Sequence, residues 1–155
     1  MADRVSASIT IGGTLPVALL PDLLAAIERE GLSTEWDGEP FTPDQLPEGE
    51  PLSLMAHEVA WGHFRELEAF CVKHGLPYAR WSGAYGGQWG AERLVFMGSG
   101  EAQSYAADED DYILMGRCTA ERLGSFPAII AHFNAADFVI PPLVIADSSK
   151  AVAHG

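Results

Sequence analysis

The chain has 155 residues, of which 48% are hydrophobic and 20% are charged. This composition is typical of one globular domain and excludes collagen-like and strongly disordered chains. Nine Lys and Arg against 22 Asp and Glu give a net charge of −13. This charge argues against direct binding to nucleic acid or to an anionic membrane, because both require basic patches. A partner with a basic surface suits it better.

The sequence favours a cytoplasmic protein. The chain does not open with a basic segment followed by an apolar one, and no apolar run approaches the ~18 residues that a membrane span requires. Cys71 and Cys118 have neither CxxC nor disulfide-framework spacing, which suits a reducing compartment. We find no complete motif for a cofactor, and expect none to be bound.

The first third of the chain predicts a strand, a helix and a loop. Residues 5–11 alternate apolar and small polar side chains, which is typical of a strand with one buried face. A helix should begin near Pro21 and end at Gly31. The proline- and acid-rich residues 33–51 should form a long loop, and residues 32–36 could contain a short strand.

The middle of the chain predicts a second strand and a second helix. Residues 52–56 are typical of a strand. Apolar spacing then predicts a helix that ends at Gly75. The residues on its buried face are Phe64, Leu67, Cys71 and His74.

The last third predicts a hairpin and a divided helical region. Residues 78–81 and 93–97 should be two strands joined by a glycine-rich loop. Pro127 should separate a short turn at 119–124 from a helix at 127–137. The side chains expected to face inward from that helix are Ile129, Ile130 and Phe133.

These elements predict an α+β fold. Their order matches the ferredoxin-like βαββαβ motif, followed by an added hairpin strand and a C-terminal helix. We expect a single domain over residues 1–146, with an apolar stretch at 143–146 and a disordered tail at 147–155.

The negative charge is concentrated in two segments, 33–51 and 101–111, which contain 11 of the 22 acidic residues and no Lys or Arg. Elsewhere, 11 acidic residues face 9 basic ones, so the remainder is nearly neutral. Aromatic residues lie within or beside both segments, a combination typical of protein interfaces. The predicted partner-binding residues are Glu35, Trp36, Asp37, Glu39, Asp44, Glu48, Glu50, Glu101, Tyr105, Asp108, Glu109, Asp110, Asp111 and Tyr112.

One use of such segments is imitation of a phosphate backbone, by which an acidic protein occupies the basic groove of a nucleic-acid-binding protein. Anti-restriction and anti-CRISPR inhibitors work in this way, and the chain resembles them in charge and size alone. The alternative is that both segments are solvated loops that keep the protein in solution.

Two groups of residues invite a comparison with metal sites, and neither completes a motif. His57-Glu58 and His63 would need histidines four apart to match HExxH, but the histidines are six apart. Asp108 to Asp111 cannot match an EF-hand loop, because Tyr112 occupies its fifth position. We therefore expect no metal site.

Cys118 is the best single candidate for a nucleophile, because a helix N-terminus and Arg117 could activate its thiol. It lies in no known catalytic signature, and a buried structural thiol is the preferred interpretation. No catalytic residue is assigned.

The glycine-rich loop carries Trp81, Tyr85 and Trp89, which could present flat side chains to a partner or a ligand. We treat these three residues as a secondary interface. The alternative is that the tryptophans pack as core under the hairpin.

The sequence therefore predicts a non-enzymatic interaction protein that binds a basic surface of a protein partner. Reversal of Asp108, Asp110 and Asp111 to Lys should abolish that binding and leave the fold intact. The alternative is a small enzyme or ligand-binding protein with a pocket near the aromatic-glycine loop. A homo-oligomer is a third possibility, for which an exposed apolar patch would be the sign.

Overall fold

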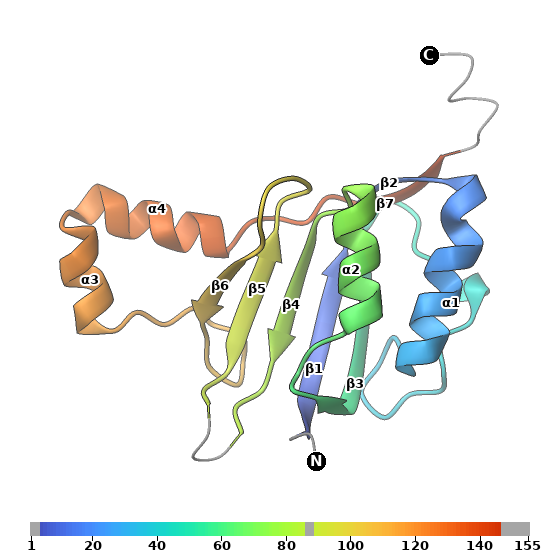
Figure 1. Ribbon diagram of the computed structural model, residues 1–155, viewed down its shortest axis with the longest axis horizontal. Helices are drawn as coiled ribbons and strands as arrows, with labels where there is room; N and C mark the ends of the chain where they lie inside the picture. Colours follow the sequence, from blue (N-terminus) through green and yellow to red (C-terminus); the bar gives the residue numbers. More distant parts are fainter. Residues whose placement is uncertain (1–3, 86–88, 147–155) are drawn as a thin grey trace.

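A computed structural model of the chain describes residues 4–85 and 89–146 (Figure 1). Its centre is a five-stranded antiparallel sheet with the strand order β3-β1-β4-β5-β6. These strands are β1 (Arg4–Ile11), β3 (Leu52–Ala60), β4 (Tyr78–Ser82), β5 (Glu92–Phe96) and β6 (Gln103–Ala106). The mixed α+β class predicted from the sequence is thus confirmed.

The predicted strand alternation sets the two faces of the sheet. In β1, Ile9 is buried on one face and lies opposite Leu54 of β3 and Arg80 of β4. Ser8 lies on the other face, opposite Met55 and Trp81. Because side chains alternate along every strand, this register assigns each residue of the sheet to one face.

Two helices cover the first face. α1 (Leu20–Glu30) and α2 (Arg65–His74) lie side by side across the sheet (Figure 1). Each ends at the predicted glycine, Gly31 or Gly75, in the left-handed conformation with a φ of 68°. Leu67 and Cys71 of α2 point into the core, as the apolar spacing predicts.

The ferredoxin-like topology is not confirmed. Residues 32–36 form no strand, and only Ser33 makes an isolated bridge, to Met55. The segment instead belongs to the long loop, which contains a short 3₁₀ helix at Pro43–Gln45. β3 extends to Ala60, beyond the predicted strand end at residue 56, since a bulge opposite Ser6 absorbs the change in register.

A second, two-stranded sheet joins distant parts of the chain. β2 (Gly13–Pro16) follows β1 directly, precedes a 3₁₀ turn at Val17–Leu19, and pairs in parallel with β7 (Leu143–Ala146). A Cβ on Gly12 would lie 1.8 Å from the carbonyl oxygen of Pro141, so only glycine allows the two segments to approach this closely. The sequence predicted the apolar stretch at 143–146 but neither β2 nor β6.

The divided helical region forms an arm that extends beyond β6 (Figure 1). It consists of α3 (Arg117–Leu123) and α4 (Phe126–Ala136). Ser125 begins α4 by accepting a hydrogen bond from the backbone N–H of Ala128. The prediction that Ile130 faces inward is wrong, because that side chain is 41% exposed.

Within residues 4–85 and 89–146, no helix has both the length and the apolar character that a membrane crossing requires. The predicted tail at 147–155 lies outside the described residues, as do two of the glycines expected in the hairpin loop, Gly86 and Gly87.

Candidate functional site

The two acidic segments meet at Trp81, on the sheet face opposite α1 and α2. The ring of Trp36, from the first segment, lies edge-on to the ring of Trp81 with a centroid separation of 6.4 Å. The indole Nε1–H of Trp81 donates to the backbone carbonyl of Asp108, from the second segment, at 2.9 Å. We call this region, defined by Glu35, Trp36, Asp37, Trp81 and residues 108–112, the acidic face.

Several acids of the second segment have structural contacts. Asp108 Oδ1 accepts from the backbone N–H groups of Asp110 and Tyr112, which closes a tight turn. Glu109 accepts from the backbone N–H of Ala84. Asp110 is exposed, and its carboxylate has no hydrogen bond or ion pair with the described residues.

Asp111 also holds this turn in place. Its Oδ2 accepts from Arg93 Nη1 at 2.7 Å, and its backbone has a φ of 64°, in the left-handed region. Reversing Asp111 would therefore put a positive charge against Arg93. The expectation that Asp108, Asp110 and Asp111 can be reversed together without loss of the fold is not supported.

A hollow of about 320 Å³ lies on the sheet face beside this turn. Trp81, Arg93, Asp111 and Asp137 contribute to its lining, above the hydroxyl groups of β1. Asp111 Oδ1 is buried and has no partner among the described residues. Burial raises the pKa of Asp111, and although Arg93 lowers it, nearby Asp137 raises it further.

The other predicted partner-binding residues lie outside the acidic face as defined above. Glu39, Asp44, Glu48, Glu50 and Glu101 are exposed. Tyr105 is half-buried beneath α4, where its ring lies edge-on to His132. The sequence did not indicate Asp137, which reaches the hollow only because α4 ends there.

His57, Glu58 and His63 do not form a common site. His57 lies on the acidic face, 2.7 Å from Ser6 Oγ and 3.3 Å from Asp37. Glu58 sits in the bulge with a φ of 59°. His63 lies on the opposite side of the sheet, since the chain turns between β3 and α2.

That turn places a tryptophan in an unusual backbone conformation. Trp61 and Gly62 both have positive φ values, 58° and 71°, and the N–H of His63 donates to the carbonyl of Ala60. Turns of this kind strongly prefer Asn, Asp or Gly, and a bulky residue there is strained. Gly62 also lies directly against β4, where an added Cβ would be 2.6 Å from the Cβ of Ser82.

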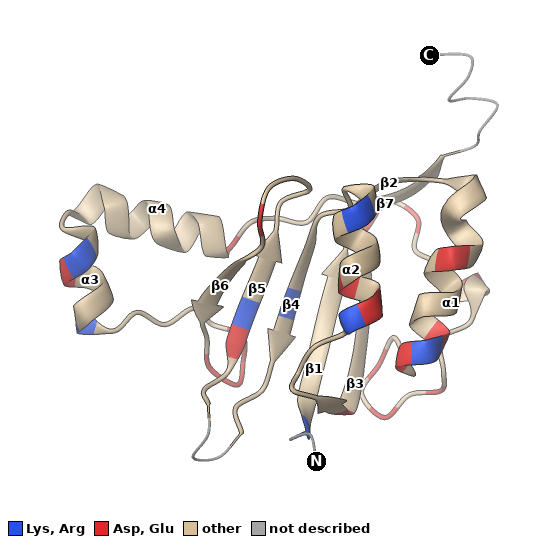
Figure 2. Cartoon of the chain, viewed as in Figure 1, with Lys and Arg blue, Asp and Glu red and all other residues tan. Residues whose placement is uncertain are grey.

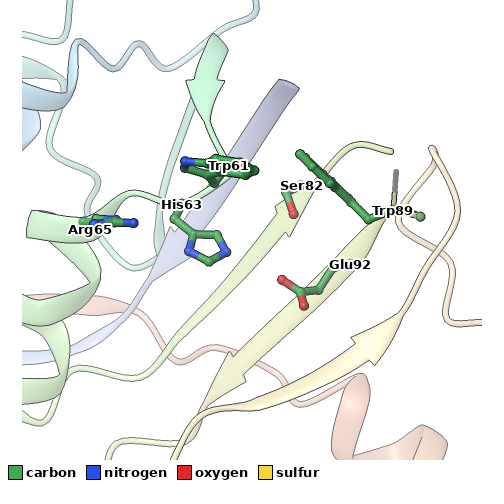
Figure 3. A pocket seen from close by; sticks show the side chains of 7 residues that line it. Trp61, His63, Arg65, Ser82, Trp89 and Glu92 are labelled. Atoms are coloured by element: carbon green, nitrogen blue, oxygen red, sulfur yellow. The ribbon is translucent and has the colours of Figure 1, made fainter. Parts of the chain in front are cut away.

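The turn forms one wall of a cleft of about 360 Å³, which we call the tryptophan cleft (Figure 3). The rings of Trp61 and Trp89 have centroids 5.8 Å apart and are tilted by 36°. His63 and Glu92 point towards each other across the space beside them (Figure 3). The residues that line the cleft are Trp61, His63, Arg65, Ser82, Trp89, Gly90 and Glu92.

A buried arginine supports this cleft from within the sheet. Arg80 donates to both oxygens of Glu68 and to Glu92, and Glu92 also accepts from Ser104. Burial lowers the pKa of His63, and the charge of Arg80 lowers it further, against the opposing effect of Glu68 and Glu92. The lowered pKa favours the neutral imidazole of His63, which has one donor and one acceptor nitrogen.

The structure separates the three aromatic residues of the predicted secondary interface. Trp81 belongs to the acidic face, whereas Tyr85 stacks on Trp89 beside the cleft at 5.1 Å. Trp61 was not among the interface residues predicted from the sequence. The sequence sign that could have identified it is the pair Trp61-Gly62 directly after a strand, because a turn there would normally contain a small or polar residue in place of the tryptophan.

Two remaining candidates can be placed directly. Cys118 is exposed, so the expectation that it is a buried structural thiol is wrong, whereas Cys71 is buried as predicted. Within the part of the chain that the structure describes, no cluster of three His, Cys, Asp or Glu residues could hold a metal ion. No protein family, curated protein or solved structure matches this chain.

Proposed function

We propose that the chain is an interaction protein whose acidic face binds a basic surface of a protein partner. The observation that carries this proposal is the meeting of both acidic segments at Trp81, beside a hollow that contains Asp111 and Asp137. A hollow with an indole wall and a carboxylate oxygen that has no partner among the described residues suits a Lys or Arg side chain.

The surroundings of the hollow support the same assignment. Trp36 and Tyr112 are exposed and would add apolar contact area, while Glu35, Asp37 and Asp110 would attract a basic partner over a longer range. The sharpest form of the proposal is inhibition of a nucleic-acid-binding protein, by occupation of its basic groove.

The test is capture of partners from a lysate of cells that contain the protein, at low and at moderate salt. The informative variant reverses Glu35 and Asp110 to Lys, because both side chains are exposed and neither carboxylate has a hydrogen bond or ion pair with the described residues to lose. The matched control reverses Asp22 and Glu28 of α1, which changes the net charge equally on the opposite side of the sheet.

We expect a basic, nucleic-acid-binding protein to be captured by the wild type and the control but not by the variant. Salt should weaken the capture, since screening reduces attraction between exposed charges. Equal capture by the variant, or no specific capture by any form, would contradict the proposal.

The arm favours self-association as a second function. α4 carries no charged residue, and Figure 2 shows it as an uncoloured helix in an otherwise acidic chain. Phe126 is 73% exposed and Ile130 41%, although both are large and apolar. Contact between the arms of two copies would bury these side chains without bringing their acidic segments together.

Sedimentation or light scattering across a range of concentrations tests this second function. Ile130→Lys should shift the protein towards the monomer. The matched control is Val72→Lys on α2, which changes a valine of similar exposure (49%) outside the arm. A wild type that stays monomeric at all concentrations would contradict self-association.

A further inference from the structure

The tryptophan cleft has the size and the walls of a small-molecule site. Its volume of about 360 Å³ falls within the range of about 300–1,000 Å³ that is typical of ligand pockets. Trp61 and Trp89 contact each other at an angle, so they form an aromatic corner. A planar ring of a ligand can stack on one of these indoles while the edge of that ring contacts the other indole.

The backbone supports a role for Trp61 beyond packing. Trp61 is 44% exposed, so burial in the core does not explain a bulky side chain at a positive φ. Strain of this kind is concentrated at ligand sites, where the surrounding structure holds it. Here Gly62 holds the turn against Ser82, and the strained residue directs its indole over the cleft.

The polar groups of the cleft match the edge of a nitrogen heterocycle. His63, as a neutral imidazole, offers one donor and one acceptor. The Ser82 hydroxyl offers both functions, and Glu92 offers acceptor oxygens that Arg80 and Ser104 hold in position. Ring N–H and amino groups would donate to Glu92, and ring nitrogen or carbonyl acceptors would receive from His63.

The charged groups at and beneath the cleft balance one another. Arg65 lies at the lining of the cleft and Arg80 lies beneath it, paired with Glu68 and Glu92. The positive charge of Arg80 already opposes protonation of His63. Together, these two arginines and two glutamates carry no net charge, which suits an uncharged ring.

We propose that the tryptophan cleft binds an uncharged nitrogen heterocycle of the nucleobase type, stacked on Trp61 and hydrogen-bonded at its edge by His63 and Glu92. This site is separate from the acidic face, because the two lie on opposite sides of the sheet. A nucleoside or a nucleotide could supply the base, and in a nucleotide Arg65 would contact the phosphate.

Calorimetric titration with adenosine, guanosine, cytidine and uridine tests the proposal. We expect saturable binding of at least one nucleoside at one site per chain. Trp61→Gly should weaken it by about 5- to 150-fold, the range that corresponds to loss of one stacking contact. The variant should remain folded, because glycine accepts a positive φ without strain. Trp61→Phe should restore part of the affinity.

The matched control is Trp36→Ala, which removes a tryptophan of nearly the same exposure, 43%, from the acidic face. It should leave nucleoside affinity unchanged, and Trp61→Gly should leave capture of a basic partner unchanged. The two proposals therefore fail independently.

Three outcomes would overturn this inference: no saturable binding of any of the four nucleosides, equal affinity in Trp61→Gly and the wild type, or tighter binding of choline than of every nucleoside. The 5′-monophosphates identify the source of the base. If a monophosphate binds more tightly than its nucleoside, and Arg65→Gln removes that difference, the ligand is a nucleotide. If the two bind equally, the ligand is a nucleoside.

Discussion

Arg80 donates from Nη1 to both carboxylate oxygens of Glu68, at 3.1 Å each, and only 1% of the arginine side chain is exposed. The pair joins the centre of the sheet to α2. Since Arg80 also contacts Glu92, one buried guanidinium forms ion pairs with two carboxylates. Glu68 in turn accepts from the backbone N–H of Phe64, just before α2 begins.

Arg80→Ala should strongly destabilise the protein, because it leaves two carboxylates in or near the core without their positively charged partner. Removing one member of a buried pair typically lowers the free energy of unfolding by about 3–5 kcal/mol. Urea denaturation measures this change. Arg117→Ala is the control: it removes an ion pair with Glu121 in which the arginine is 90% exposed, and it should have little effect. Equal losses in both variants would contradict the role given to Arg80.

The two cysteines should differ sharply in reactivity. Cys71 is buried, and this burial raises the pKa of its thiol to about 12, so almost no thiolate is present at pH 8. Cys118 is exposed on α3. A colorimetric thiol reagent should therefore modify one cysteine in the native protein and two in guanidinium chloride. Rapid modification of both native thiols would contradict the burial of Cys71.

His63 should make stability depend on pH. Its pKa is lowered below the ordinary 6.5, chiefly by burial, so the folded state binds a proton less readily than the unfolded chain does. The contribution of His63 to the free energy of unfolding therefore rises with pH through the window between the lowered value and 6.5, and it falls as the medium is acidified. Above this window it is constant.

The comparison of wild type with His63→Gln isolates that contribution. Denaturation at several values between pH 5 and pH 7 should give a smaller rise in stability for the variant. His57→Gln is the control on the acidic face, where the histidine pairs with exposed Asp37. Parallel curves for wild type and His63→Gln would contradict the prediction.

Gly12→Ala should destabilise the junction between β1 and β2. Its new Cβ would overlap the carbonyl oxygen of Pro141, at 1.8 Å, and backbone must move to relieve this contact. Gly90→Ala is the control, since a Cβ there would have no neighbour within 4 Å among residues 4–85 and 89–146. Thermal unfolding should show a lower midpoint for Gly12→Ala and nearly the wild-type midpoint for Gly90→Ala.

Local signals predicted much of this fold. The alternation in residues 5–11 correctly predicted β1. Glycines that favour the left-handed conformation correctly predicted the ends of α1 and α2. The prediction failed at residues 32–36 because the pairing of a strand depends on partners that are distant in the sequence. A single bridge from Ser33 to Met55 is all that forms there.

The site was harder to predict for a related reason. Composition identified both acidic segments, but it could not indicate that Trp81 brings them together or that Arg93 neutralises Asp111. The tryptophan cleft depends on residues from a turn, a helix start and two strands. Such a group becomes visible only when the chain has folded, apart from the local sign at Trp61 and Gly62.

The parallel pairing of β2 with β7 joins residues 13–16 to residues 143–146. Closing so long a loop is slow and has a large entropic penalty, whereas the five-stranded sheet forms between segments that are closer along the chain. β7 should therefore dock last during folding and detach first during partial unfolding. In hydrogen exchange, the amides of β7 should lose protection before those of β1, and the arm that leads into β7 would be released with it.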